Sequence, residues 1–262
     1  MTRKLKSHIL FSLAFALIIS PVKAGSAAEQ HALLTGVLVD HVRDGLVDYK
    51  NICKDNRFEE YLGQLSNTDV GLLSKEESMA FWINAYNSFT VELICKNYPI
   101  KSINDLHTGG LILGSVIGRT AWDKSFINVN GKSYSLGEIE HKILRPDFKD
   151  PRIHFAIVCA ARSCPPLRSE AYEGFSLNDQ LNDQGRIFLV KRADLNSFDG
   201  DKRIANLSSI FSWFLKDFGR NSKELLEHLC AYLPESLSRD IKANPSAWKI
   251  KYNKYDWSLN EQ

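Results

Sequence analysis

Residues 152–167 read RIHFAIVCAARSCPPL, and this stretch predicts the centre of the fold. Its first half is apolar on both alternating faces, a pattern typical of a strand that is buried on both sides. His154 lies at the start of the expected strand, Cys159 lies near its end, and Cys164 follows in a loop. The two prolines at 165–166 keep that loop from becoming helix. We therefore expect a rigid, buried central strand that brings a histidine and two thiols together.

Around this strand the sequence predicts mostly helices. Apolar residues recur at helical spacing in most other segments, whereas Phe126–Tyr134 reads as a hairpin with Asn-Gly at its tip. Trp248–Asn253 alternates as a strand with one buried face does. The expected fold class is therefore α+β: a helix-rich single domain around a small, mainly antiparallel sheet with a buried central strand. The expected helices are 31–44, 58–65, 79–97, 135–145, 177–191, 207–218 and 225–233.

The N-terminus has the three parts of an export signal. Basic residues come first, an apolar run follows from Ile9 to Val22, and a small-residue cleavage site ends at Ala24. The run is shorter than the roughly 20 residues that cross a bilayer, which disfavours a retained membrane anchor. We predict a signal peptide over residues 1–24 and one domain over residues 25–262. The protein is then exported, periplasmic or secreted, without stable membrane insertion.

The net charge of the chain restricts the classes of molecule that it can bind. Removal of residues 1–24 takes away four cations and no acid, so the formal net charge changes from +2 to −2. A nucleic-acid binder usually has a basic face, and no familiar binding motif is present either. We expect no nucleic-acid partner. The sequence leaves open whether the ligand is a small molecule, a peptide or a glycan.

The glycine-rich segment 106–119 resembles a nucleotide-binding loop only in composition. It lacks the Gly-Lys-Ser/Thr ending of a phosphate loop, and no strand precedes it as a dinucleotide site requires. We expect no nucleotide cofactor there. The segment is a connector or a flap over a cleft.

The expected helix 79–97 is apolar nearly all round, so it belongs in the core. A capping box at Ser74–Glu77 opens it. Asn84 and Asn87 lie three residues apart on one of its faces, and buried amides must find hydrogen-bond partners. They either tie adjacent backbone together or hold a substrate carbonyl or oxyanion. We keep both as substrate-binding candidates.

The expected helix 135–145 opens with a second capping box and ends before Pro146. Glu140 shares its apolar stripe, because a leucine lies four residues away on either side. A carboxylate that faces the core must be paired or neutralised. Glu140 therefore either forms a structural ion pair, with Arg145 or Arg152, or has a catalytic or histidine-orienting role.

Five cysteines follow the predicted signal, and an odd number leaves at least one thiol unpaired or paired elsewhere. Cys53, Cys95 and Cys230 lie in expected helices or connectors without a histidine or acid motif beside them. We predict that these three are structural at most. A chain of this length buries enough apolar surface to fold without disulfides as its main stabilisation.

Several segments together resemble a family known as domain of unknown function 547. The resemblance covers most of the mature chain but implies no established activity. Some eukaryotic relatives carry the domain beside a glutaredoxin module, an association with thiol chemistry. The family usually has Asn-Cys where this chain has Val158-Cys159. The matching phrases are AFWINAYN at 80–87, SLGEIEHKILR at 135–145, RIHFAIVCAARSCPPL at 152–167, LSSIFSWFLKDF at 207–218 and YDWSLN at 255–260.

A first hypothesis for the function is a thiol-dependent hydrolase or acyl transferase. Cys164 is then the nucleophile and His154 its general base, and Glu140 or Asp256 orients the imidazole. The nucleophile needs a depressed pKa, from a nearby imidazolium or a helix N-terminus. The surrounding phrase matches none of the local signatures of cysteine proteases. This hypothesis comes first because Cys164, His154 and Glu140 have no other joint explanation.

The alternative is a non-catalytic binding or scaffold module. Cys159 and Cys164 then form a disulfide that closes a short loop and stabilises the fold by about 2 kcal/mol. A reversible form of this bond would be a redox site, although the spacing differs from the familiar C-x-x-C. Cys159 and Asp256 also remain candidates for substrate binding.

A metal site is the third hypothesis. Glu140, His141, His154, Cys159 and Cys164 are all of the right ligand types. Adjacent residues of a helix point about 100 degrees apart, so Glu140 and His141 cannot easily bind one ion. We expect neither a metal nor another cofactor.

Overall fold

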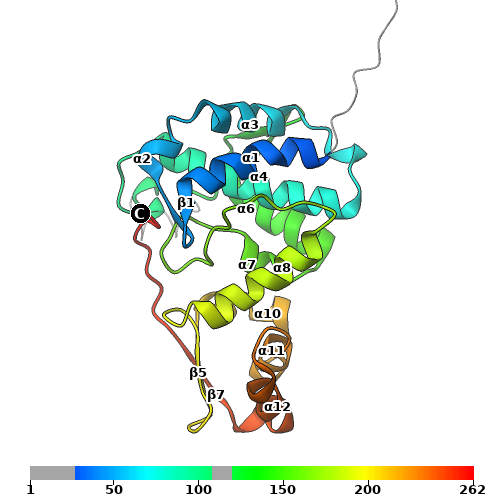
Figure 1. Ribbon diagram of the computed structural model, residues 1–262, viewed down its shortest axis with the longest axis vertical. Helices are drawn as coiled ribbons and strands as arrows, with labels where there is room; N and C mark the ends of the chain where they lie inside the picture. The colour runs from blue at the N-terminus through cyan, green and yellow to red at the C-terminus, as the bar shows by residue number, and fades with distance from the viewer. Residues whose placement is uncertain (1–26, 108–119) are drawn as a thin grey trace, which may run out of the picture.

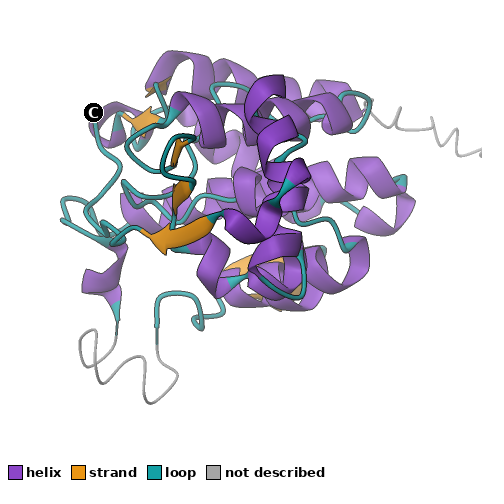
Figure 2. Ribbon diagram, turned by 90° about the horizontal axis from the view of Figure 1, so that it is seen from below, coloured by secondary structure: helices purple, strands orange, loops and turns teal. Residues whose placement is uncertain are grey.

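The computed structural model describes residues 27–107 and 120–262. Helices make up most of its regular structure (Figure 2), and the strands of this part of the chain form three small sheets. This is the helix-rich α+β class that the sequence predicts. The expected signal peptide and most of the glycine-rich segment lie outside the described residues. Within the described ranges, no helix is long and apolar enough to span a membrane.

The N-terminal helices form one end of the molecule (Figure 1), with α4 at their centre. Helix α4 is buried along most of its length, as its apolar sequence predicts. The capping box is also confirmed: Ser74 accepts from the Glu77 amide, and the Glu77 carboxylate accepts from the Ser74 amide. The elements here are α1 (Ala27–His41), β1 (Val42–Arg43), β2 (Leu46–Val47), α2 (Tyr49–Ile52), α3 (Asn56–Asn67), η1 (Val70–Leu72), α4 (Lys75–Cys95) and η2 (Ile103–Leu106).

A disulfide joins Cys53 to Cys95 in this helical end of the molecule. Cys53 caps the C-terminus of α2, and Cys95 is the last residue of α4. The bond therefore fixes two helix ends to each other. It agrees with a structural role for both residues, although no sequence pattern paired them.

The predicted hairpin and the helix after it are present. Strand β3 pairs with β4 around Asn130-Gly131, and the second capping box links Ser135 and Glu138. The expected end before Pro146 is wrong, because a π-helix continues through it. A π-helix is wider than an α-helix, which accommodates a proline that would clash with an α-helical turn. The elements are β3 (Ile127–Val129), β4 (Lys132–Tyr134), α6 (Leu136–Glu138) and the π-helix η3 (Ile139–Phe148).

The expected buried central strand is wrong. Ile153–Ala156 instead forms a single helical turn, α7, and the chain becomes extended only from Ile157. All four side chains of α7 are buried, and all but His154 are apolar. A short, fully apolar run suits a buried helical turn as well as a buried strand. The prediction of burial was right, and the prediction of the element was wrong.

The C-terminal half adds helices and a three-stranded sheet at the other end of the molecule (Figure 1). In that sheet β5 is antiparallel to β6, and β6 is parallel to β7. The expected helix 207–218 is divided at Phe214 into α9 and α10. The elements are α8 (Leu177–Arg186), the π-helix η4 (Ile187–Lys191), β5 (Ser197–Asp199), β6 (Ile204–Leu207), α9 (Ile210–Trp213), α10 (Leu215–Phe218), α11 (Ser222–Leu229), α12 (Glu235–Ala243), η5 (Pro245–Ala247) and β7 (Lys249–Tyr252).

The C-terminal tail connects the two ends of the molecule. After β7 it runs back along one side to the N-terminal hairpin (Figure 1). There the Val47 amide donates to the Asn260 carbonyl, and the Gln262 amide donates to the Val47 carbonyl. On its way the tail passes the loop that carries Cys164, where the Ser163 amide donates to the Asp256 carbonyl. This path carries Tyr255 to the cysteines.

Candidate active site

A pocket of about 210 Å³ contains both cysteines of the central stretch. Hollows of about 280 and 600 Å³ lie elsewhere, but neither is lined by a histidine or a thiol. We take the smaller pocket as the candidate site because its titratable side chains can carry chemistry. It is lined by Tyr86, Trp122, Glu140, His141, His154, Ile157, Cys159, Cys164, Pro165, Ile210, Trp213, Phe214, Tyr255 and Trp257.

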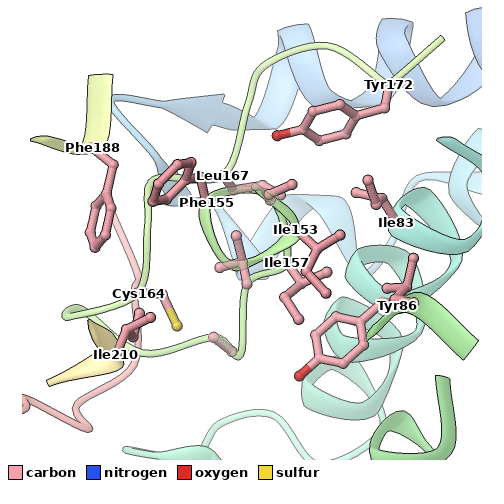
Figure 3. Close-up of a cluster of buried hydrophobic side chains, with 14 of the residues drawn as sticks. Ile83, Tyr86, Ile153, Phe155, Ile157, Cys164, Leu167, Tyr172, Phe188 and Ile210 are labelled. Atoms are coloured by element: carbon pink, nitrogen blue, oxygen red, sulfur yellow. The ribbon is translucent and has the colours of Figure 1, made fainter. Parts of the chain in front are cut away.

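Cys164 is buried, and several donors surround its sulfur. The Cys159 amide donates to this sulfur at 3.1 Å, and the Tyr255 hydroxyl lies 3.2 Å from it. The Cys159 sulfur lies only 2.6 Å away. Figure 3 shows Cys164 in the buried apolar cluster near Phe155 and Ile210. The core therefore holds the thiol in place while polar groups reach its sulfur.

These contacts set the protonation of the two thiols. Burial alone would raise the pKa of Cys164, but hydrogen bonds from Cys159, Tyr255 and the Ala161 and Cys159 backbones lower it below its ordinary value. The pKa of Cys159 is raised well above its ordinary value by the hydrogen bond to Cys164 and by burial. Cys159 therefore stays protonated, and its S–H donates a hydrogen bond to the Cys164 sulfur. Cys164 is the better nucleophile of the pair.

His154 is 2% exposed and is held by Asp217, on α10. Its Nε2 lies 2.7 Å from Asp217 Oδ2. Because a carboxylate only accepts, Nε2 must carry the proton, and Nδ1 is left with a free lone pair. Burial lowers the pKa of His154, although the hydrogen bond and charge of Asp217 oppose this. The imidazole is thus neutral and oriented, as a general base requires.

Asp217 also binds Arg145, which reaches it from η3. Arg145 donates from Nε at 2.7 Å and from Nη2 at 2.9 Å, a bidentate pair. The hydrogen bond to His154 is the largest of the effects that lower the pKa of Asp217 far below its ordinary value. Phe214 packs against both partners of Asp217, with the His154 ring centroid 4.0 Å away and the Arg145 guanidinium 5.1 Å away. The imidazole has little freedom to turn.

Glu140 is inward-facing, as expected, with 6% of its surface exposed. The two predicted ion pairs are wrong: Arg145 binds Asp217, and Arg152 binds Asp150. Burial raises the pKa of Glu140 to about 7, against the opposing effects of Arg145 and Tyr86. Its Oε1 is buried and has no hydrogen-bond partner. A carboxyl that titrates near neutral pH in a pocket can give or take a proton.

The acid that orients His154 was missed. Neither Glu140 nor Asp256 contacts the imidazole in the described structure, whereas Asp217 does. One signal was available, because Asp217 stands among aromatic residues in the phrase SWFLKDF. An acid within an apolar helix needs a partner. The identity of that partner, 63 residues away, could not be read from the sequence.

Asn84 and Asn87 have the backbone-tying role and not the substrate-binding one. Asn84 donates to the Tyr172 carbonyl and accepts from the Tyr172 amide. Asn87 does the same with the Ala156 carbonyl and the Val158 amide, which fixes the chain between α7 and Cys159. Neither amide lines the candidate pocket. Their contribution to the site is to position it.

Asp256 lies next to the candidate site and not in it. It lines the 280 Å³ hollow, and its carboxylate accepts from the Ser258 amide and hydroxyl. Its neighbour Tyr255 lines both hollows. Among the described residues, no group of three or more His, Cys, Asp or Glu side chains has an arrangement that could hold a metal ion.

The fold and the pocket define a helix-rich α+β domain with adjacent thiols beside a buried histidine that an aspartate holds. The family model described as "Protein of unknown function, DUF547" matches residues 70–189, and this match supports the resemblance that the sequence indicated. The match includes Glu140, His154 and both pocket cysteines, whereas Asp217 and Tyr255 lie beyond it. Searches of curated proteins and of solved structures gave no match.

Proposed function

We propose that this protein is an exported, thiol-dependent hydrolase or acyl transferase that uses Cys164 as its nucleophile. The observation that carries the proposal is the set of donors around the Cys164 sulfur, in the same pocket as an imidazole held by Asp217. The donors favour the thiolate, which is the reactive form. The Cys53–Cys95 disulfide and the predicted signal support an exported location, because disulfides persist in oxidising compartments.

His154 differs from the base of a direct thiol–imidazole pair. No hydrogen bond joins His154 to Cys164 in the described structure, although both line the pocket. The hydrogen bonds to the Cys164 sulfur lower its pKa, so they favour the thiolate without a direct bond to the imidazole. His154 therefore acts on the substrate side, as a base toward the attacking water or acceptor.

The reaction proceeds in two steps. The Cys164 thiolate attacks an acyl carbonyl carbon, a C–S bond forms, and the bond to the leaving group breaks as that group takes up a proton. A water or an acceptor then attacks the thioester and gives its proton to His154 Nδ1. The C–S bond breaks and Cys164 leaves as the thiolate. Glu140, with a pKa of about 7, can supply the proton to the leaving group.

A second function is favoured by one observation, the 2.6 Å between the Cys159 and Cys164 sulfurs. A disulfide has its sulfurs about 2 Å apart, so a small movement would allow the bond to form. The protein is then a binding or scaffold module with a disulfide at the pocket, or a redox site if the bond is reversible.

The deciding experiment measures the state and the reactivity of Cys164 in protein purified from the exported compartment. Peptide mapping without reductant tells whether Cys159 and Cys164 are linked. Iodoacetamide at pH 6 then reports the thiolate, because an ordinary thiol with pKa near 8.5 is almost fully protonated there. p-Nitrophenyl acetate serves as a simple acyl donor, and mass spectrometry of the Cys164 peptide detects the acetyl thioester.

The proposal requires a free Cys164 that is alkylated at pH 6 and acetylated by the ester. Cys230, which is buried and free, provides the internal control and should react with neither reagent. His154→Ala should leave the alkylation rate nearly unchanged but slow the release of the acetyl group. A quantitative Cys159–Cys164 disulfide would favour the second function. Free cysteines that react with nothing would defeat both.

A further inference from the structure

Four of the aromatic residues that line the pocket pack together: Trp122, Trp213, Tyr255 and Trp257. The Trp257 ring centroid lies 4.5 Å from Tyr255, 5.8 Å from Trp213 and 5.9 Å from Trp122. The corresponding interplanar angles are 52°, 16° and 71°, so Trp213 stacks on Trp257 whereas the Tyr255 and Trp122 rings are inclined to it. We call these residues the aromatic group. Its rings form an angled wall and not one flat platform.

The charges of the pocket have one sign. Neither lysine nor arginine lines the pocket in the described part of the chain. Burial lowers the pKa of both lining histidines, His141 and His154, so both are neutral at neutral pH. The remaining ionisable groups that can carry charge there are the Glu140 carboxylate and the Cys164 thiolate. Both charges are negative.

The Arg145 guanidinium does not fully neutralise the Glu140 carboxylate. Arg145 affects the pKa of Glu140, but its guanidinium is bound in bidentate fashion by Asp217. Glu140 Oε1 is left without a hydrogen-bond partner. A buried carboxylate oxygen without a partner is costly, and a ligand cation would offset that cost.

We propose that the pocket binds its substrate through an organic ammonium group, which contacts the aromatic group and pairs with Glu140. Aromatic rings carry negative charge on their faces and attract such cations, most strongly when water is excluded. A pocket of about 210 Å³ is smaller than typical drug-sized sites, so it holds a head group and not a long chain. This inference rests on the proposed function and names the chemical class of its substrate.

A glycan fits the same pocket less well. Sugar hydroxyls need several hydrogen-bond partners, and polar groups left unpaired on binding reduce affinity. In the described residues no serine, threonine, asparagine or glutamine side chain lines this pocket. Its lining of rings, thiols and one carboxyl suits a compact cation that makes few directional bonds.

The test compares two probes of the same shape on the full mature protein. Choline carries a trimethylammonium group, and 3,3-dimethylbutan-1-ol replaces its charged nitrogen with carbon. We expect choline to bind about tenfold more tightly than the neutral alcohol, by calorimetry and by quenching of tryptophan fluorescence. Choline should also protect Cys164 from iodoacetamide. Methyl N-acetyl-β-glucosaminide is the probe for the glycan alternative.

Three variants assign the effect to the pocket. Glu140→Gln keeps the shape and removes the charge, so it should abolish most of the preference for choline. Trp213→Ala truncates a half-exposed ring of the aromatic group and should weaken choline binding. Phe175→Ala is the matched control, because Phe175 is 83% exposed and does not line the pocket. It should change neither probe's binding.

Equal binding of the two isosteres would overturn the inference and define a merely apolar pocket. Preferential binding of the glucosaminide, or no binding of choline at all, would overturn it as well. These outcomes are separate from the proposed function. A Cys164 that reacts with iodoacetamide at pH 6 in the absence of any ligand supports the nucleophile whichever probe binds.

Discussion

The two cysteine pairs of this protein lie in contrasting surroundings. Cys53 and Cys95 are joined by a disulfide that fixes two helix ends in the N-terminal half. Cys159 and Cys164 are free thiols in contact, with the Tyr255 hydroxyl and the Cys159 amide directed at the Cys164 sulfur. The surroundings of a cysteine therefore decide the role of its thiol. Donors that stabilise the thiolate favour reactivity, and a partner held at bonding distance gives a crosslink.

The largest expected effect is on the chemistry of the second pair. Cys164→Ser removes the nucleophile, so formation of the acetyl adduct from p-nitrophenyl acetate should fall on the order of 1,000-fold or more. Stability should change little, which circular dichroism and urea unfolding check. Cys159→Ser serves as the control, because its hydroxyl can still donate to Cys164. Full acylation of the Cys164→Ser protein would place the nucleophile elsewhere.

Removal of the first pair, Cys53 and Cys95, should change stability and not reactivity. Replacing Cys53 and Cys95 together by serine opens a loop with a sequence separation of 42 residues, and loop entropy predicts a loss of about 4 kcal/mol in the free energy of unfolding. Urea denaturation measures the loss. At low temperature, where the variant stays folded, alkylation of Cys164 at pH 6 should be unchanged. A parallel loss of that alkylation would show that the two pairs are not independent.

Glu140 provides a pH test beside the second pair. Its pKa is raised from 4.5 to about 7 on folding, so the folded state binds the proton more tightly. The resulting stability is fully present below about pH 4.5 and is lost as the pH rises through 7. This loss amounts to about 3 kcal/mol. Glu140→Gln should remove it, so the difference between variant and wild type grows in the variant's favour from pH 4.5 to 7.5. A constant difference across that range would mean that folding does not raise the pKa of Glu140.

The smallest effect is expected at Cys230, which belongs to neither pair. It is buried in the core, and its thiol donates a hydrogen bond to the Ser238 carbonyl at 3.7 Å. Cys230→Ser places a more polar group in the core and should cost roughly 1 kcal/mol of unfolding free energy. Acetyl-adduct formation at Cys164 should not change. Loss of that reaction in a stable Cys230→Ser protein would contradict the assignment of Cys230 as structural.

Sequence reasoning succeeded where neighbouring residues decide the structure. The capping box at Ser74 and the Asn130-Gly131 hairpin rest on contacts within a few residues, so their outcome is fixed locally. The inward face of Glu140 follows from helical periodicity in the same way. The prediction of a strand at α7 failed, because a buried apolar run fits a helical turn or a strand equally.

The residue pattern alone predicts the helix-rich class, the burial of the central stretch, and the presence of His154 and Cys164 within that stretch. Only the tertiary structure decided that Asp217 holds His154, that Tyr255 reaches Cys164, and that Cys53 bonds to Cys95. Those contacts join residues 63, 91 and 42 positions apart. Their formation depends on how whole helices and the C-terminal tail pack. Local propensity does not determine that packing, and the chemistry of the site depends on the packing.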